Sequence, residues 1–446
     1  MSVVPGDIDT DGGPPMTIPL RHFLVALALL VLGGAAMLGT ATGLLAGRVA
    51  SLHLLLAGWV CVTIMGAMTQ FVPVWSGVAL HSRRLARWQL RLVTVGLLGF
   101  AAAWLSGRLA LVPLAGLVLL AGFWTFVYNL GRTLLSAWPW DATERHFALA
   151  LAFLLGVTAL GFSLAVDLAH PILADLGLAR PRVVAGHATL AVFGVVLTTI
   201  VGAITQLATM FTQTEFDRID DALLTTERIW YPVGVLALAG GRVVGHALLV
   251  SVGAVVVCWS LAALAVVVGR RLLAARVDWS PMLSRYAVAV VALLAWVAWT
   301  LPAWLADPIA LDATFGPGGS AHLLTIGAVG FVVLGTLYHV VPFIIWERRY
   351  SDLLGYEDVP MIDDLYDDRL ATADFACLTA GTTLLVVAGL GPLPAWLAAV
   401  GGPVLVLGLL LAVANLALTI RRHAPQSLLG IAAGADGANP TTEKES

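Results

Sequence analysis

Charged residues are scarce in this chain of 446 residues. Asp, Glu, Lys and Arg make up only 11% of it, whereas hydrophobic residues make up 59% and the mean hydropathy is +0.93. A soluble globular domain would carry about 25% charged residues. The shortage of charge therefore excludes an ordinary soluble domain and predicts a polytopic integral membrane protein in contact with lipid, with no nucleic-acid partner.

Cysteine is nearly absent as well. Cys61, Cys258 and Cys377 all fall inside apolar stretches, with neither the spacing of a metal site nor that of a disulfide framework. No Cys-x-x-Cys-His motif occurs, so any haem c must come from another protein. The first 20 residues are acidic and lack the basic start and short apolar core of a signal peptide. We therefore expect no disulfide, no covalently attached haem and no signal peptide.

Twelve apolar stretches are present, and a membrane-spanning helix needs roughly 20 apolar residues. We place them at about 22–46, 51–76, 90–108, 110–135, 146–168, 183–212, 229–244, 247–269, 284–305, 319–346, 372–391 and 394–420. The seventh stretch is the shortest and weakest. The predicted fold is all-α, with one twelve-helix membrane domain over residues 21–422. An N-terminal cytoplasmic segment, 1–20, precedes it, and a disordered cytoplasmic tail, 423–446, follows it.

An internal repeat organises these stretches. Residues 51–75 are repeated in variant form at 320–344, and a third copy lies at 182–211. The alignment pairs His53 with His322, Gly58 with Gly327, Gly66 with Gly335 and Gly202 with Gly66. Because the copies fall in the second, sixth and tenth stretches, the sequence predicts three pseudo-repeats of four helices each.

Arginine placement predicts the orientation. Cationic loops mark the cytoplasmic side of membrane proteins, and here alternate loops carry Arg83, Arg84, Arg87, Arg91, Arg270, Arg271, Arg276, Arg348, Arg349, Arg421 and Arg422. Both termini are then cytoplasmic. The acid-rich stretches 215–228 and 347–369 are interpreted as solvated connectors. With this orientation His53, His187 and His322 all lie near the outer ends of their helices.

Histidines inside a membrane are costly and suggest a site. Two neutral imidazoles from different helices at one depth can hold a single haem iron, which makes His53 and His322 candidate axial ligands. Hydrogen bonding between helices and another metal are the alternatives. Small residues beside the pair could leave room for the macrocycle, namely Gly58, Gly66, Gly327 and Gly335. Close helix packing is the alternative role for these glycines.

His187 differs from the other two histidines. It aligns two residues before His53 and His322, and Thr189 takes the ligand position. With His246 at the outer end of the seventh helix, it forms a candidate second metal site. No acid lies in the middle of a predicted span, so the sequence predicts no proton channel.

Two segments resemble known families. HLLTIGAVGFVVLGTLYHVVP (322–342) resembles the tenth helix of cytochrome cbb-type oxidases. HLLLAGWVCVTIMGAMTQFVPVWSG (53–77) is similar to the first histidine helix of the NnrS family, a twelve-helix group linked to the nitric oxide response. Together with the three units, this resembles subunit I of haem-copper oxidases and nitric oxide reductases.

The resemblance implies that His53 and His322 hold a low-spin haem b and that His187 falls near the first copper ligand. It also implies a prokaryotic plasma membrane and a partner such as a cytochrome c, a cupredoxin-type electron donor or other respiratory subunits. Two departures matter. Ser320 stands where the oxidases carry the histidine of the active-site haem, and Gly245-His246 stands where they carry two histidines.

These features predict a degenerate member of the superfamily. It would bind one bis-histidine haem b, without copper, and transfer electrons or handle a small gas such as NO or O₂ without a complete binuclear centre. Whether it is an enzyme stays open. The alternatives are a haem-free membrane scaffold or transporter with the same fold, and an active oxidase or NO reductase with an atypical metal site.

Overall fold

The computed structural model describes residues 14–433 and contains no strand in that range, apart from one isolated bridge. Eleven helical spans are long and apolar enough to cross a membrane, which confirms an all-α membrane protein. They are Thr17–Ala41 (α1), Arg48–Ser76 (α2, η2, α3), Arg83–Leu105 (α4), Leu109–Ser136 (η3, α5), Ala142–Asp167 (α6), Arg180–Thr212 (α8, η4, α9), Ala247–Leu273 (α11), Pro281–Ala306 (α12), Ser320–Arg349 (α13, η5, α14), Asp368–Ala388 (α15) and Trp396–His423 (α16).

A further long helix, α10 (Arg218–Val244), lies where the seventh span was predicted, but it is not among the apolar eleven. It starts well before residue 229, so the interpretation of 215–228 as a connector is wrong from Arg218 onward, although many residues of this first part of the helix are exposed. Asp220 and Glu227 are buried within α10 rather than exposed to solvent. These charged residues lower the hydropathy of the first half of α10. The apolar pattern therefore predicted only the second half of the helix, 229–244.

Charge pairing at the start of α10 explains why acids are tolerated there. Asp217 caps the helix, and the backbone N–H of Asp220, which donates to it, holds the pKa of the Asp217 carboxyl below its ordinary value. Arg270 Nε of α11 donates to Asp220 at 2.9 Å, and Arg271 Nη2 lies 3.0 Å from the same carboxylate. The acids of α10 thus balance the basic end of α11.

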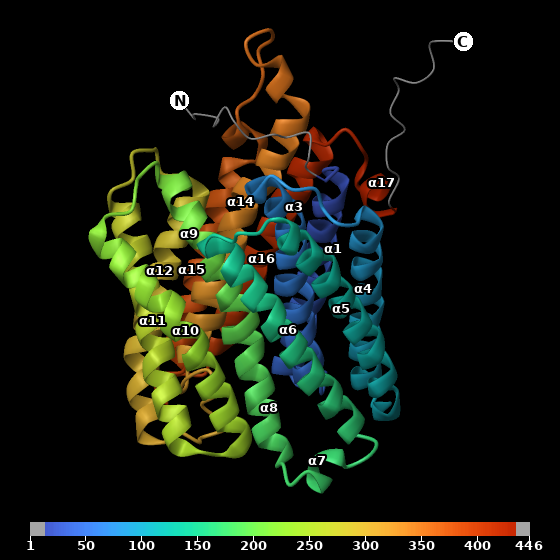
Figure 1. Cartoon of the computed structure of the whole chain (residues 1–446), viewed down its shortest axis with the longest axis vertical. Coiled ribbons are helices and arrows are strands. Elements are labelled where there is room, and N and C mark those ends of the chain that lie inside the picture. The colour runs from blue at the N-terminus through green and yellow to red at the C-terminus, as the bar shows by residue number, and fades with distance from the viewer. Residues whose placement is uncertain (1–13, 434–446) are drawn as a thin grey trace.

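The two ends of the described chain meet at one end of the molecule (Figure 1). Arg21 Nε near the start of α1 donates to the carbonyl of Ile431 at 2.6 Å. Ile431 is fully buried in α17 (Leu428–Ala433), so this part of the tail predicted to be disordered is a docked helix. The rest of that tail, 434–446, and residues 1–13 of the N-terminal segment lie outside the described residues. We call the end of the molecule where Arg21 contacts Ile431 the arginine-rich end. The short helix α7 (Ile172–Asp175) lies at the opposite end (Figure 1).

The connector between α14 and α15 is made of short pieces, as its composition suggested. It contains the 3-10 turns η6 (Ser351–Leu353) and η7 (Ile362–Leu365), with loop between them. Trp346 Nε1 of α14 donates to the carbonyl of Pro360 at 2.8 Å and fastens the connector to the membrane helices.

Three spans change from α-helix to π-helix along their length. The π segments are η2 (Leu54–Val60), η4 (Leu190–Leu197) and η5 (Leu323–Gly330). They begin directly after His53, Thr189 and His322. π-Helical turns are rare and frequently mark functional sites. The same distortion therefore follows the same aligned position in each of the three spans.

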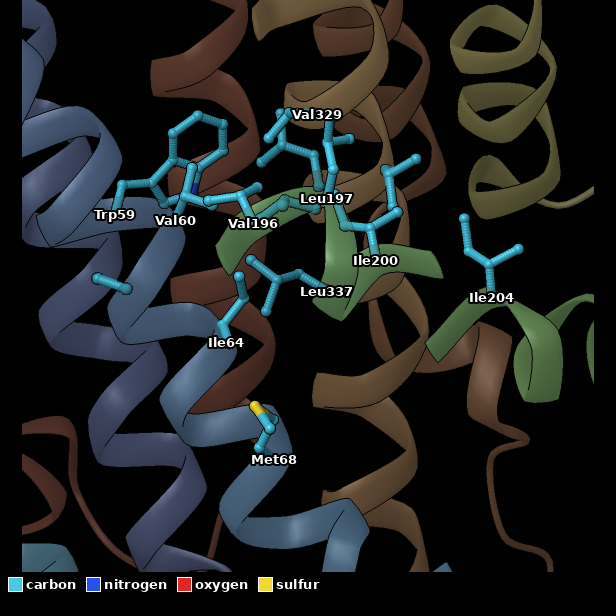
Figure 2. Close-up of a cluster of buried hydrophobic side chains, with 14 of the residues drawn as sticks. Trp59, Val60, Ile64, Met68, Val196, Leu197, Ile200, Ile204, Val329 and Leu337 are labelled. Atoms are coloured by element: carbon cyan, nitrogen blue, oxygen red, sulfur yellow. The ribbon is translucent and has the colours of Figure 1, made fainter. Parts of the chain in front are cut away.

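The centre of the molecule is filled with apolar side chains. Figure 2 shows them meeting from the spans that carry η2, η4 and η5, among them Trp59, Ile64, Val196, Ile200, Val329 and Leu337. Each of these six is at most 9% exposed. We call this group the central apolar cluster.

Candidate functional site

The structure brings His53 of α2 beside His187 of α8. Their ring centroids are 6.3 Å apart and the ring planes differ by only 19°. Phe100 of α4 packs on the other side of His53, with a centroid distance of 4.5 Å. Both histidines are half-buried. The site thus joins the second and sixth predicted spans rather than the second and tenth.

Hydrogen bonds fix how the two imidazoles face. The Nδ1 atom of His53 lies 2.8 Å from the carbonyl of Val49, and that of His187 lies 2.9 Å from the carbonyl of Val157. A carbonyl only accepts, so Nδ1 carries the proton in each neutral ring. This leaves both Nε2 lone pairs free for a metal, in the arrangement that protein ligands commonly use.

Gly161 of α6 makes room for His187. A Cβ at this position would lie 2.9 Å from Cε1 of the imidazole, which is shorter than van der Waals contact. A side chain here would push the ring away from the Val157 carbonyl. The small residue is therefore part of what positions His187.

His322 lies half-buried at the start of η5. Among the described ring contacts, none joins His322 to His53. The pairing of these two histidines stays a prediction.

His246 is exposed and caps α11, where its Nδ1 accepts from the backbone N–H of Leu249 at 3.3 Å. Within residues 14–433, no group of three or more His, Cys, Asp and Glu side chains could hold a metal. The structure shows no contact between His187 and His246 within the described residues, so the second metal site at this pair stays a prediction.

The four predicted haem-adjacent glycines lie at close helix contacts. A Cβ on Gly58 would meet Leu29, and one on Gly66 would meet His22, both on α1. On the tenth span, Gly327 faces Ala292 and Gly335 faces Arg285, both on α12. The four glycines thus allow close helix packing, which was the alternative role for them. Their contact with a haem stays a prediction.

This glycine packing recurs a third time on α6. On α6, His146 packs against Gly202, as His22 packs against Gly66 and Arg285 against Gly335. A second glycine contact lies seven residues later on each helix: Leu29 with Gly58, Phe153 with Gly194 and Ala292 with Gly327. In the third helix of each predicted unit, a buried polar residue stands seven positions before a glycine: Gln89 before Gly96, Glu227 before Gly234 and Asp374 before Gly381.

Two buried ion pairs were missed by the sequence analysis. His146 of α6 pairs with Glu227 of α10, and Arg285 of α12 pairs with Asp374 of α15. Glu227 lies in the stretch that was interpreted as a solvated connector, and Asp374 lies at the third residue of the predicted span 372–391, where the sequence analysis assigned it no role. The spacing of a polar residue seven positions before a glycine in α4, α10 and α15 is the signal that could have found them.

No protein-family model and no curated protein matches this chain. The function therefore has to be argued from the residues and their geometry.

Proposed function

We propose that this chain is a haem-b-binding integral membrane protein that transfers electrons, with His53 and His187 as the axial ligands. The observation that carries the proposal is the facing of two imidazoles, each with a free Nε2, at a centroid distance of 6.3 Å. The sequence had paired His53 with His322, and that pair remains the competing assignment.

The spacing fits one metal between two rings. His53 and His187 lie with their ring centroids 6.3 Å apart and their planes nearly parallel, so both would be within reach of one haem iron. The donor set also fits, because two neutral imidazoles are a common axial pair for haem b. When bound, the haem would supply one-electron transfer, and a bis-histidine iron has no open position for oxygen or nitric oxide.

The chain's own residues supply positioning. The carbonyls of Val49 and Val157 hold the ring orientation, and Gly161 gives His187 its place. Phe100, which packs on His53, shields that imidazole. An electron partner such as a cytochrome c or a cupredoxin-type protein would approach the α7 end, toward which both histidines lie.

We also propose that α10 completes a set of twelve membrane helices arranged as three units of four. The recurring π segments and the threefold glycine packing support this arrangement. The proposed units are α1 to α5, α6 to α11 and α12 to α16. The proposed relation to haem-copper oxidase subunit I rests on this pattern together with the sequence resemblance.

A haem-free scaffold is the second candidate. The glycines that could border a haem are filled by α1 and α12, and the central apolar cluster is tightly packed. A transporter is less well supported by the same observation, because substrate sites are built from polar groups near the middle of the membrane.

The test is a reduced-minus-oxidised optical spectrum of the purified protein, combined with a pyridine haemochrome assay. We expect a sharp alpha band and about one haem b per chain, which corresponds to one bis-histidine iron. His53→Ala and His187→Ala should both abolish the band, whereas His322→Ala and His246→Ala should keep it. Added CO should leave the spectrum of the reduced protein unchanged.

Loss of the band in His53→Ala and His322→Ala, with His187→Ala unaffected, would restore the pair predicted from sequence. A colourless protein that is well folded, by circular dichroism and size-exclusion chromatography, would overturn the haem proposal and favour the scaffold.

A further inference from the structure

A second polar site lies toward the arginine-rich end, inside the second unit. Nε2 of His146 is 3.3 Å from both carboxylate oxygens of Glu227. The side chains are 4% and 1% exposed. Nδ1 of His146 lies 2.7 Å from the carbonyl of Ala142 and therefore donates to it. Nε2 and the carboxylate must then share a proton, since two facing lone pairs would repel.

The equivalent positions in the other units cannot exchange a proton in this way. In the third unit the cation is Arg285, which stays charged at every accessible pH, and Asp374 also accepts from Tyr338. In the first unit Gln89 replaces the acid. Among these three aligned positions of the described residues, only the one in α6 and α10 pairs a histidine with an acid, and Oε2 of Glu227 has no hydrogen bond there.

Water can reach the neighbourhood of this pair. A cavity of about 40 Å³ lies beside the start of α6, and its polar lining is Ser76, Asp141, Thr143, Glu144 and Gln206. One water occupies about 30 Å³ of liquid and needs two to four polar partners, which this lining offers. The cavity therefore has room and partners for water.

The step from the cavity to the pair is short. Thr143 precedes His146 by three residues, a rise of about 4.5 Å along the helix. Its hydroxyl lies 3.3 Å from that of Thr205 on α9, and both Thr143 and His146 pack against Gly202. Thr143 therefore lines the cavity on one side and lies one helical turn from His146 on the other, next to Thr205.

Beyond Glu227 the path ends. Tyr231, one turn further along α10, is fully buried and donates its hydroxyl to the carbonyl of Phe193 at 2.7 Å. Phe193 belongs to η4, whose neighbouring residues Val196 and Leu197 enter the central apolar cluster (Figure 2). A proton that reaches Glu227 has to leave by the way it came.

The charged groups around the pair are few. On α10, Arg228 is the neighbouring cation; on α6, Glu144 is the nearest acid and accepts from Ser76 of α3. The α9 face offers only the hydroxyl of Thr205 and the glycine.

We propose that His146 and Glu227 form a proton-binding site that fills and empties from the arginine-rich end only. A proton from cavity water moves to the pair, which changes from imidazolium with carboxylate to imidazolium with carboxylic acid. A hydronium ion in the cavity loses one O–H bond and becomes water, the Glu227 carboxylate gains one O–H bond, the site gains one positive charge, and no electron moves. The site takes up and releases a proton inside the membrane without moving it across.

The experiment is infrared difference spectroscopy of the purified protein between two pH values, in H₂O and in D₂O. A protonated carboxyl gives a C=O stretch that shifts in D₂O, and we expect one that Glu227→Gln removes. Thr143→Val should slow the deuterium exchange of this band by roughly tenfold, as expected for a barrier raised by one broken hydrogen-bonded step. Glu347→Gln, at the end of α14, is the matched control and should keep both band and rate.

Absence of any Glu227-dependent band over the pH range in which the protein stays folded would overturn the proposal. If Glu227→Gln does not fold, Glu227→Asp should shift the band in place of removing it, and an unshifted band would count equally against the site. In oriented proteoliposomes, a pH step on the arginine-rich side alone should produce the band. Production from the α7 side would refute the closed path. None of these measurements depends on haem.

Discussion

The proposed second and third units each hold a buried ion pair at aligned positions, and the two acids differ in the number of donors from which they accept. Asp374 accepts from Arg285 and from Tyr338, and Asn415 in turn donates to Tyr338 at 3.1 Å. Glu227 accepts only from His146, and one of its oxygens has no hydrogen bond within the described residues. The aligned position thus holds a permanently charged ion pair, Arg285 with Asp374, in one proposed unit. In the other it holds His146 with Glu227, which we propose exchanges a proton.

The difference has a physical basis. A buried ion pair recovers more of the cost of leaving water when further hydrogen bonds reach its charged groups, and Asp374 has such a bond from Tyr338 whereas Nε of Arg285 has none within the described residues. Arginine cannot lose its proton, so its partner must stay ionised, and the third unit surrounds that partner with donors. Histidine can lose its proton, so the proposed second unit does not hold a permanent cation.

The largest expected effect comes from neutralising the acid of each pair. Asp374→Asn leaves the permanently charged Arg285 buried without its anion and should cost about 3–5 kcal/mol. Glu227→Gln should cost about 1–3 kcal/mol, because His146 can shed its charge and face a neutral amide. Chemical unfolding in detergent, monitored by circular dichroism, measures both. Equal losses for the two variants would remove the distinction between a fixed and an exchangeable pair.

A smaller effect is expected from closing the gap beside the exchangeable pair. Gly202→Ala would put a Cβ 2.6 Å from Cβ of His146, and overpacking of this kind costs about 1–3 kcal/mol. Gly131→Ala on α5 is the control, since a Cβ there meets nothing within 4 Å and should stabilise the helix by about 0.5–1 kcal/mol. Thermal unfolding compares the two, and similar midpoints would show that the α6–α9 contact is not tight.

The smallest effect concerns the end of the path. Tyr231→Phe removes the hydroxyl that holds the Phe193 carbonyl, but Thr198 still donates to that carbonyl at 3.1 Å, so we expect a loss of about 0.5–1.5 kcal/mol. Tyr128→Phe, at a residue 53% exposed, should change stability by less than about 0.5 kcal/mol. If Tyr231→Phe also opened proton passage to the α7 side, the closed end would lie at this hydroxyl and not in the central apolar cluster.

Much of the fold could be read from hydropathy, because a membrane-spanning helix satisfies its backbone internally and reveals itself by composition. The start of α10 was missed since its acids suggested solvent. Asp217 followed by Asp220 in a capping box was the local signal for a helix start. The acids of α10 are paired by α11, and hydropathy carries no information about pairing.

The candidate site was only partly predictable. Repetition and charge placement predicted that His53, His187 and His322 lie near one depth. The sequence alone also showed that they fall within apolar spans, where a histidine is costly and suggests a site. It could not determine which ring faces which. Each of the three spans contains a π segment directly after the aligned position, and the extra residue in a π turn rotates everything before it relative to everything after it. Side-chain direction on these helices therefore departs from α-helical periodicity. Only the tertiary structure, through the packing of α2, α6 and α8, decided that His187 lies beside His53 and that Glu227 lies beside His146, because these contacts depend on how separate helices are rotated and docked.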